Sequence, residues 1–115
     1  MNSYNEIDGV PSVANRWLLT ELLRDQLGFD GLVVSDYDAV PMLVKTFHTA
    51  SSAGQAAIQA LSAGLDVDLP GGEVFRTIAD EVAAGRLDEA VVDQAVFRVL
   101  QALSLIHISE PTRPY

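Results

Sequence analysis

Cysteine is absent from the 115 residues of this chain, which excludes a disulfide framework and a thiolate metal site. Basic residues are scarce: seven lysines and arginines stand against sixteen aspartates and glutamates, giving a formal net charge of -9. Nucleic acids and anionic membranes are bound through a basic face, so we expect no nucleic acid and no membrane among the partners. No apolar run reaches transmembrane length. The compartment stays open, because a signal peptide would lie upstream of Met1.

Hydrophobic residues make up 49% of the chain, which is enough for the core of one small domain or of a piece of a larger one. Residues 1–11 are rich in Asn, Ser, Asp, Gly and Pro, and they predict a loop. Ser12 is placed to cap a helix that runs to about Leu27, and Gly28 follows as its stop.

Two short apolar segments predict strands. Residues 32–35, LVVS, do not alternate apolar with polar side chains, which indicates a strand buried on both faces, as in a parallel sheet. Residues 65–70, LDVDLP, predict a second strand. Residues 38–50 between them read as irregular or weakly helical, with Pro41 as a break.

Three further helices are predicted. The first begins at a cap supplied by Ser51 or Ser52 and ends at Gly64, and the others cover about residues 73–84 and 88–103. The order loop, helix, strand, helix, strand, helix, helix is typical of an α/β chain with parallel βα units. Two strands are too few to close a sheet. The pattern is that of the end of a (β/α)₈ barrel without its beginning.

The last thirteen residues, 103–115, read LSLIHISEPTRPY and differ in style from the helix before them. Residues 103–113 resemble, without a mismatch, the translation of a transposase-type sequencing adapter. A frayed C-terminal extension is the alternative interpretation. We expect the native domain to occupy residues 1–102, and residues 103–115 to be a non-native tail from adapter read-through.

An aspartate, Asp36, follows directly on the first predicted strand. In (β/α)₈ barrels the reactive groups sit at the C-terminal ends of the strands. An ionised carboxylate there can attack an electrophilic carbon or support an oxocarbenium-like centre. A helix N-cap is the alternative role for an aspartate after a strand. Position alone leaves both interpretations open.

Three blocks of sequence together resemble the family 3 glycoside hydrolases, which are β-glucosidases, β-xylosidases and their relatives. The blocks are MNSYNEIDGVP at 1–11, LGFDGLVVSDYDAV at 27–40 and ALSAGLDVDLP at 60–70. Their order and spacing make the resemblance specific, and it covers nearly all of residues 1–102. It implies that this chain forms the last third of a (β/α)₈ barrel, from the end of strand six through strand eight with their helices.

The resemblance also implies a set of site residues. The family's nucleophile is the aspartate of an S-D-[WY] block, which is Asp36 here, between Ser35 and Tyr37. Tyr4 and Met1 match an M-x-S-Y block, in which the tyrosine lies against the nucleophile and the methionine lines the sugar subsite. We expect the Tyr4 phenol to donate to the Asp36 carboxylate. Tyr37, where many relatives carry tryptophan, can stack on a sugar ring. Simple packing is the alternative for both tyrosines.

The implied activity is that of a retaining β-glycosidase acting by double displacement on a β-linked oligosaccharide or on an aryl or alkyl glycoside. No cofactor is expected, and the choice between glucosides and xylosides stays open, as does the oligomeric state. The family's acid/base residue and the sugar-binding residues of earlier strands cannot be matched here. We therefore expect the intact parent to be an enzyme and this chain alone to be inactive.

Two other interpretations belong to different classes of protein. Asp66 and Asp68 form a D-x-D pair, which some sugar-nucleotide enzymes use for a metal, but further ligands are not evident and structural hydrogen bonding is favoured. The second alternative is a self-contained, acidic α/β interaction module without catalysis.

Overall fold

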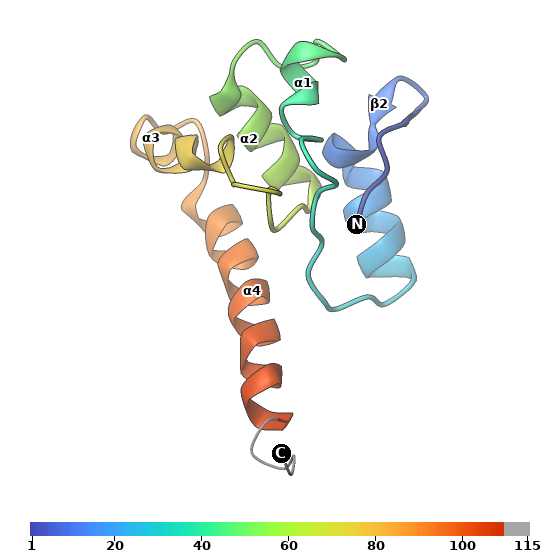
Figure 1. Cartoon of the computed structure of the whole chain (residues 1–115), viewed down its shortest axis with the longest axis vertical. Coiled ribbons are helices and arrows are strands. Elements are labelled where there is room, and N and C mark those ends of the chain that lie inside the picture. Colours follow the sequence, from blue (N-terminus) through green and yellow to red (C-terminus); the bar gives the residue numbers. More distant parts are fainter. Residues whose placement is uncertain (110–115) are drawn as a thin grey trace.

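A computed structural model describes the backbone of residues 1–109 and the side chains of residues 1–105. Helix α2 lies at the centre of the molecule, and α4 extends away from the remaining elements (Figure 1). The elements in chain order are β1 (Glu6–Ile7), β2 (Val10–Pro11), η1 (Ser12–Ala14), η2 (Trp17–Gln26), α1 (Met42–Lys45), α2 (Ala53–Ala63), η3 (Phe75–Thr77), α3 (Ile78–Ala83) and α4 (Glu89–Ser109).

Helix α2 follows its sequence signals closely. The side chain of Ser52 accepts a hydrogen bond from the backbone N–H of Gln55, and Gly64 ends the helix at a φ of 121°. Its inward face is built of alanines that are almost completely buried, so neighbouring elements can approach closely. Other buried apolar side chains of the same core come from η1, η2, α1 and the segments between the elements, and they include Val13, Leu19, Val33, Val40, Leu43 and Leu65.

The two predicted strands lie side by side in parallel, joined by one bridge between Val34 and Val67. The backbone N–H of Val67 donates to the carbonyl of Val33 at 3.2 Å, and the backbone N–H of Ser35 donates to the carbonyl of Val67 at 2.9 Å. These two bonds confirm the parallel pairing of the two segments, but they do not make the longer ladder that the sequence predicts.

Side chains replace the next backbone acceptor at each end of this bridge. The N–H of Val33 donates to the carboxylate of Asp66 at 2.9 Å, and the N–H of Leu69 donates to the hydroxyl of Ser35 at 2.8 Å. In a regular parallel ladder both N–H groups would donate to main-chain carbonyls. The side-chain acceptors therefore explain why the pairing is limited to a single bridge.

The prediction of a loop over residues 1–11 is wrong for its second half. Strands β1 and β2 pair antiparallel in a short hairpin. Asp8 and Gly9 turn the chain with φ values of 50° and 81°, which is the pattern of a two-residue type I′ turn. The signal was present in the sequence, because Asp-Gly between two aliphatic residues favours this turn.

The single helix predicted from Ser12 to Leu27 is two helices. The Ser12 hydroxyl does not cap a helix but donates to the backbone carbonyl of Asn5 at 3.0 Å. Asn15 is extended between η1 and η2, and its side-chain oxygen accepts from the N–H of Leu18 at 3.1 Å. Helix η2 then has π-helical bonding, which is rare and often found near functional sites.

Three smaller differences concern helix ends. Pro41 stands at the start of α1 and does not break a helix, because its fixed φ suits that position. The helix expected over residues 73–84 is divided into η3 and α3. Helix α4 continues past Leu103 to Ser109, since no glycine or proline interrupts it there. The boundary predicted near residue 103 thus falls inside a helix, and residues 110–115 lie outside the described residues.

Candidate active site

The segment that carries Asp36 is fixed on both sides of this residue. Ser35 is completely buried, and both its N–H and its hydroxyl are bonded to the neighbouring parallel segment. On the far side, the N–H of Asp38 donates to the carbonyl of Leu69 at 3.1 Å. Asp36 itself is partly buried, and its carboxylate accepts from the N–H of Tyr37 at 2.8 Å. A carboxylate that solvent can reach is thereby held at the end of a buried strand.

Tyr4 brings the N-terminal segment to this strand end. Its hydroxyl donates to the backbone carbonyl of Tyr37 at 2.6 Å. Partial burial and the negative charges of Asp36 and Asp38 raise the pKa of the Tyr4 phenol. The hydroxyl is therefore held protonated as a donor, and its hydrogen bond goes to the Tyr37 carbonyl, whereas the sequence predicted donation to the Asp36 carboxylate.

Met1 and Tyr37 differ in where they lie relative to the cluster formed by Tyr4 and Asp36. Tyr37 follows Asp36 directly, and 61% of it is exposed, so its ring is free to meet a ligand. Met1 is 76% exposed, and it lines a cavity of about 360 Å³ together with Asn2, Ser3 and apolar side chains of η2. The structure thus brings Tyr4, Asp36 and Tyr37 together, whereas Met1 lies along the flank of η2.

Asp68 has a structural position next to the cluster. Its carboxylate accepts from the N–H groups of Val74 at 3.0 Å and Phe75 at 3.2 Å, at the start of η3. Burial raises the pKa of the Asp68 carboxyl, the two N–H groups lower it, and the charges of Glu73 and Asp38 raise it further. Asp68 therefore acts first as the anchor of the turn that follows the second strand.

The carboxylate of Asp66 forms ion pairs with two arginines. Its side chain is fully buried, and its carboxylate contacts Arg24 at 2.8 Å and Arg98 at 3.0 Å in addition to the Val33 N–H. Both D-x-D carboxylates thus make the structural hydrogen bonds that the sequence favoured. Among the described residues, no group of three His, Cys, Asp or Glu side chains is arranged to hold a metal ion.

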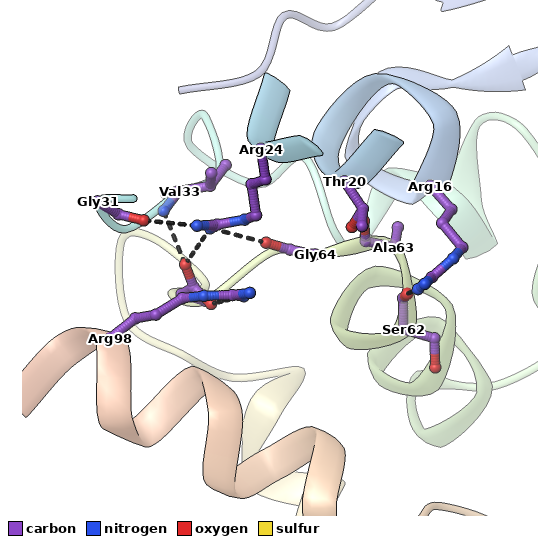
Figure 2. Close-up of polar contacts among 10 residues, drawn as sticks. Arg16, Thr20, Arg24, Gly31, Val33, Ser62, Ala63, Gly64 and Arg98 are labelled. Carbon is purple, nitrogen blue, oxygen red and sulfur yellow. Dashed lines mark hydrogen bonds and ion pairs between the residues drawn. The ribbon is translucent and has the colours of Figure 1, made fainter. Parts of the chain in front are cut away.

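Sequence reasoning did not single out the arginines that organise this region. Arg16, Thr20 and Arg24 stand four residues apart and share one face of η2. They donate in turn to the consecutive carbonyls of residues 62–64 at 2.9, 2.7 and 3.5 Å, as Figure 2 shows. The carbonyls at the end of a helix need such outside donors, so the row fixes η2 against the end of α2. The spacing of four was the available signal.

The family model for the glycosyl hydrolase family 3 N terminal domain matches residues 1–102. The chain belongs to glycosyl hydrolase family 3. This confirms the resemblance that the three sequence blocks carry.

Two curated proteins and one solved structure illustrate the relationship. The chain is 41% identical over 102 residues to a lysosomal beta glucosidase of Dictyostelium discoideum, covering 87% of this chain and 12% of that protein. It is 37% identical over 109 residues to a beta-xylosidase of Formosa agariphila, covering 89% of this chain and 15% of that protein. It superposes on a β-glucosidase structure from Erythrobacter marinus with a TM-score of 0.82 and 42% identity, covering 85% of this chain and 13% of that one.

These glycosyl hydrolase family 3 proteins are several times longer than the chain, which spans only 12–15% of their length. The structural likeness establishes an α/β fold. No helix within the described residues combines the length and the apolar character that spanning a bilayer requires.

Proposed function

We propose that this chain is the segment of a retaining β-glycosidase that carries the catalytic nucleophile, Asp36. The observation that carries the proposal is the cluster at the strand end. A reachable carboxylate stands there between two anchored residues, beside a phenol held as a donor and an exposed aromatic ring. Membership of glycosyl hydrolase family 3 supports the reaction class.

The fold proposed for the parent is a (β/α)₈ barrel, with this chain as its last third. The parallel pair would be strands seven and eight, and the loop and hairpin at residues 1–11 would follow strand six. Two features support this arrangement. The pair is parallel, and Asp36 stands at the C-terminal end of its strand, where barrels place their reactive groups.

The reaction proposed is a double displacement. An oxygen of the Asp36 carboxylate forms a bond to the anomeric carbon while the bond from that carbon to the leaving oxygen breaks. An acid from another part of the parent gives its proton to the departing oxygen. Water then attacks the anomeric carbon, loses a proton to the same residue and frees the carboxylate, so the configuration is retained. The two carboxyl groups of such a pair typically lie about 5–5.5 Å apart.

The other residues of the cluster receive supporting roles. Tyr4 holds the Tyr37 carbonyl and the Asp36 side chain in place from the N-terminal segment. Tyr37 offers its ring to the apolar face of the sugar. Met1 lines the sugar subsite in this proposal once the preceding strands are present. The substrates proposed are terminal β-glucosides or β-xylosides, in keeping with the names of the two relatives.

The test is made in the full-length parent enzyme. A 2-deoxy-2-fluoro-β-glycoside with a good leaving group forms a stable glycosyl-enzyme, and peptide mapping locates the label. We expect the label on Asp36, and we expect Asp36→Ala to abolish hydrolysis of nitrophenyl β-glycosides while azide restores turnover as the α-glycosyl azide. A label on another residue, or full activity of Asp36→Ala, would overturn the proposal.

Asp38→Asn is the matched control. Asp38 is a carboxylate two residues from Asp36 with a φ of 62°, a conformation that asparagine adopts readily. The variant keeps the N–H that bonds to Leu69, so we expect it to retain hydrolysis. The 115-residue chain alone is expected to be inactive, because the proposed acid lies outside it.

A further inference from the structure

The residue of interest is Asp66, which lies 30 positions after Asp36 in the sequence, at the start of the neighbouring parallel segment. Its side chain has no exposure to solvent, and its carboxylate receives three donors. One oxygen accepts from Arg24 and from the Val33 N–H, and the other accepts from Arg98. A buried carboxylate with this many charge-assisted bonds has one orientation.

Asp66 holds Val33 by both of its peptide groups. The carboxylate accepts from the Val33 N–H at 2.9 Å, and the backbone N–H of Asp66 donates to the Val33 carbonyl at 2.9 Å. Val33 precedes the bridge residue Val34 in the segment that leads to Asp36, three residues later. The position of Asp66 therefore sets the register between this segment and its parallel neighbour.

The two arginines tie this position to the helices on either side. Arg24 comes from η2 and also donates to the Gly31 carbonyl at 2.7 Å, while Arg98 comes from α4, as Figure 2 shows. The side chains of Arg24 and Arg98 are 8% and 18% exposed. Two cations around one buried carboxylate leave no freedom for the carboxylate to turn away from Val33.

We propose that Asp66 is a positioning residue for Asp36: clamped by Arg24 and Arg98, it fixes the strand that presents the nucleophile. The inference rests on the proposed function of Asp36. It assigns to the Arg24–Asp66–Arg98 cluster a role in the reaction in addition to its contribution to packing.

The experiment measures how fast the 2-fluoro glycoside labels Asp36 in the full-length enzyme, together with kcat and KM. Asp66→Ala removes the acceptor of the Val33 N–H. We expect it to lower the labelling rate and kcat by about 10- to 100-fold with little change in KM, since small displacements of a reacting group cost rates of this order. Asp66→Asn keeps one oxygen for Val33, and we expect it to stay within about threefold of the wild type.

Two further variants separate positioning from general loss of stability. Arg98→Met removes one of the two cations and leaves Arg24 and the Val33 N–H on the other carboxylate oxygen, so we expect a loss between those of Asp66→Asn and Asp66→Ala. Leu87→Ala opens a cavity at a leucine that is buried with Leu61 and Ala95 and is not part of the Arg24–Asp66–Arg98 cluster, and it serves as a variant with a lowered Tm. If Asp66→Ala does not fold, Asp66→Ala/Arg98→Met removes one of the two unpaired cations and takes its place.

The outcomes are distinct. Slow labelling in Asp66→Ala, with rescue in Asp66→Asn and normal labelling in Leu87→Ala, supports the proposal. Equal losses in Asp66→Ala and Leu87→Ala, or no loss in Asp66→Ala, overturn it and leave the nucleophile assignment standing. A wild-type enzyme that is not labelled at Asp36 overturns the proposed function and this inference together.

Discussion

The hydroxyl of Ser35 accepts a hydrogen bond from the backbone N–H of Leu69 at 2.8 Å, in the place of a main-chain carbonyl. Ser35 is completely buried, so water cannot replace this acceptor. The parallel pairing therefore ends with a side-chain bond immediately before Asp36. The residue that precedes the candidate nucleophile is thus part of what joins its strand to the next.

Replacing Ser35 with alanine should destabilise the chain because the N–H of Leu69 would lose the buried hydroxyl that accepts its hydrogen bond. The expected cost is about 1–3 kcal/mol of unfolding free energy. Urea denaturation followed by circular dichroism measures it. Ser35→Thr retains the hydroxyl and is expected to lose less. Equal stability of the wild type and Ser35→Ala would mean that the Leu69 N–H finds another partner.

Tyr4 should titrate at a higher pH than an ordinary tyrosine, whose pKa is about 10. Burial and the charges of Asp36 and Asp38 all oppose formation of the phenolate. Phenolate absorbance, taken as the difference between the wild type and Tyr4→Phe, isolates this group from the other two tyrosines.

The variant Asp36→Asn tests the cause of the Tyr4 shift. Removing the charge of Asp36 should lower the pKa of Tyr4 part of the way to its ordinary value, because burial remains. An unchanged titration in Asp36→Asn would show that the phenol and the carboxylate do not interact.

Asp68 should make stability depend on pH in acid. Its pKa is raised in the folded chain, so between the ordinary value and the raised value the native state binds more protons than the unfolded state. The contribution of Asp68 to the free energy of unfolding is therefore greatest below its ordinary pKa. It falls as the pH rises through the raised pKa of the folded chain. The comparison is with Asp68→Asn, which does not titrate and retains an acceptor for the Val74 N–H. A wild-type advantage over this variant that grows with pH would contradict the assignment.

Local signals in the sequence predicted the elements that depend on neighbouring residues. The cap at Ser52, the stop at Gly64 and the parallel pairing of the two apolar segments are all confirmed. The hairpin around Asp8 and Gly9 had an equally local signal that the loop interpretation overlooked. The division of the first helix at Asn15 was not predicted. The side chain of Asn15 can bond to a nearby backbone N–H and so start a new helix, but the surrounding apolar pattern is that of one continuous helix.

The candidate site was predictable to a different extent. Asp36, Tyr4 and Tyr37 were named from the sequence blocks, and the structure places them together. The cluster of Arg24, Asp66 and Arg98 was not foreseen, because its members lie 42 and 32 positions apart. One sequence does not reveal which of sixteen acids faces which base. Such pairs depend on how η2 and α4 pack, which no local pattern encodes.

Thr20 should contribute to stability through one hydrogen bond. Its hydroxyl donates at 2.7 Å to the carbonyl of Ala63, the last residue of α2. Thr20→Val keeps the shape and removes the donor, so we expect a loss of about 0.5–1.5 kcal/mol in urea denaturation. Thr20→Ser, which keeps the hydroxyl, is the control for the donor itself. A larger loss in Thr20→Ser than in Thr20→Val would assign the effect to packing of the methyl group.

The exposed apolar side chains of α4 should make the isolated chain associate with itself. Val96, Phe97 and Leu100 are 48%, 59% and 58% exposed, and they lie within five positions on a helix that extends away from the other elements (Figure 1). Exposed apolar patches of this kind drive association unless a partner surface covers them. We expect the 115-residue chain to bind a hydrophobic dye and to sediment as oligomers. Phe97→Ser with Leu100→Ser should reduce both signals, whereas Arg86→Ser, which changes an exposed residue outside α4, should not. A monomeric wild-type chain that does not bind the dye would show that α4 is covered within the chain itself.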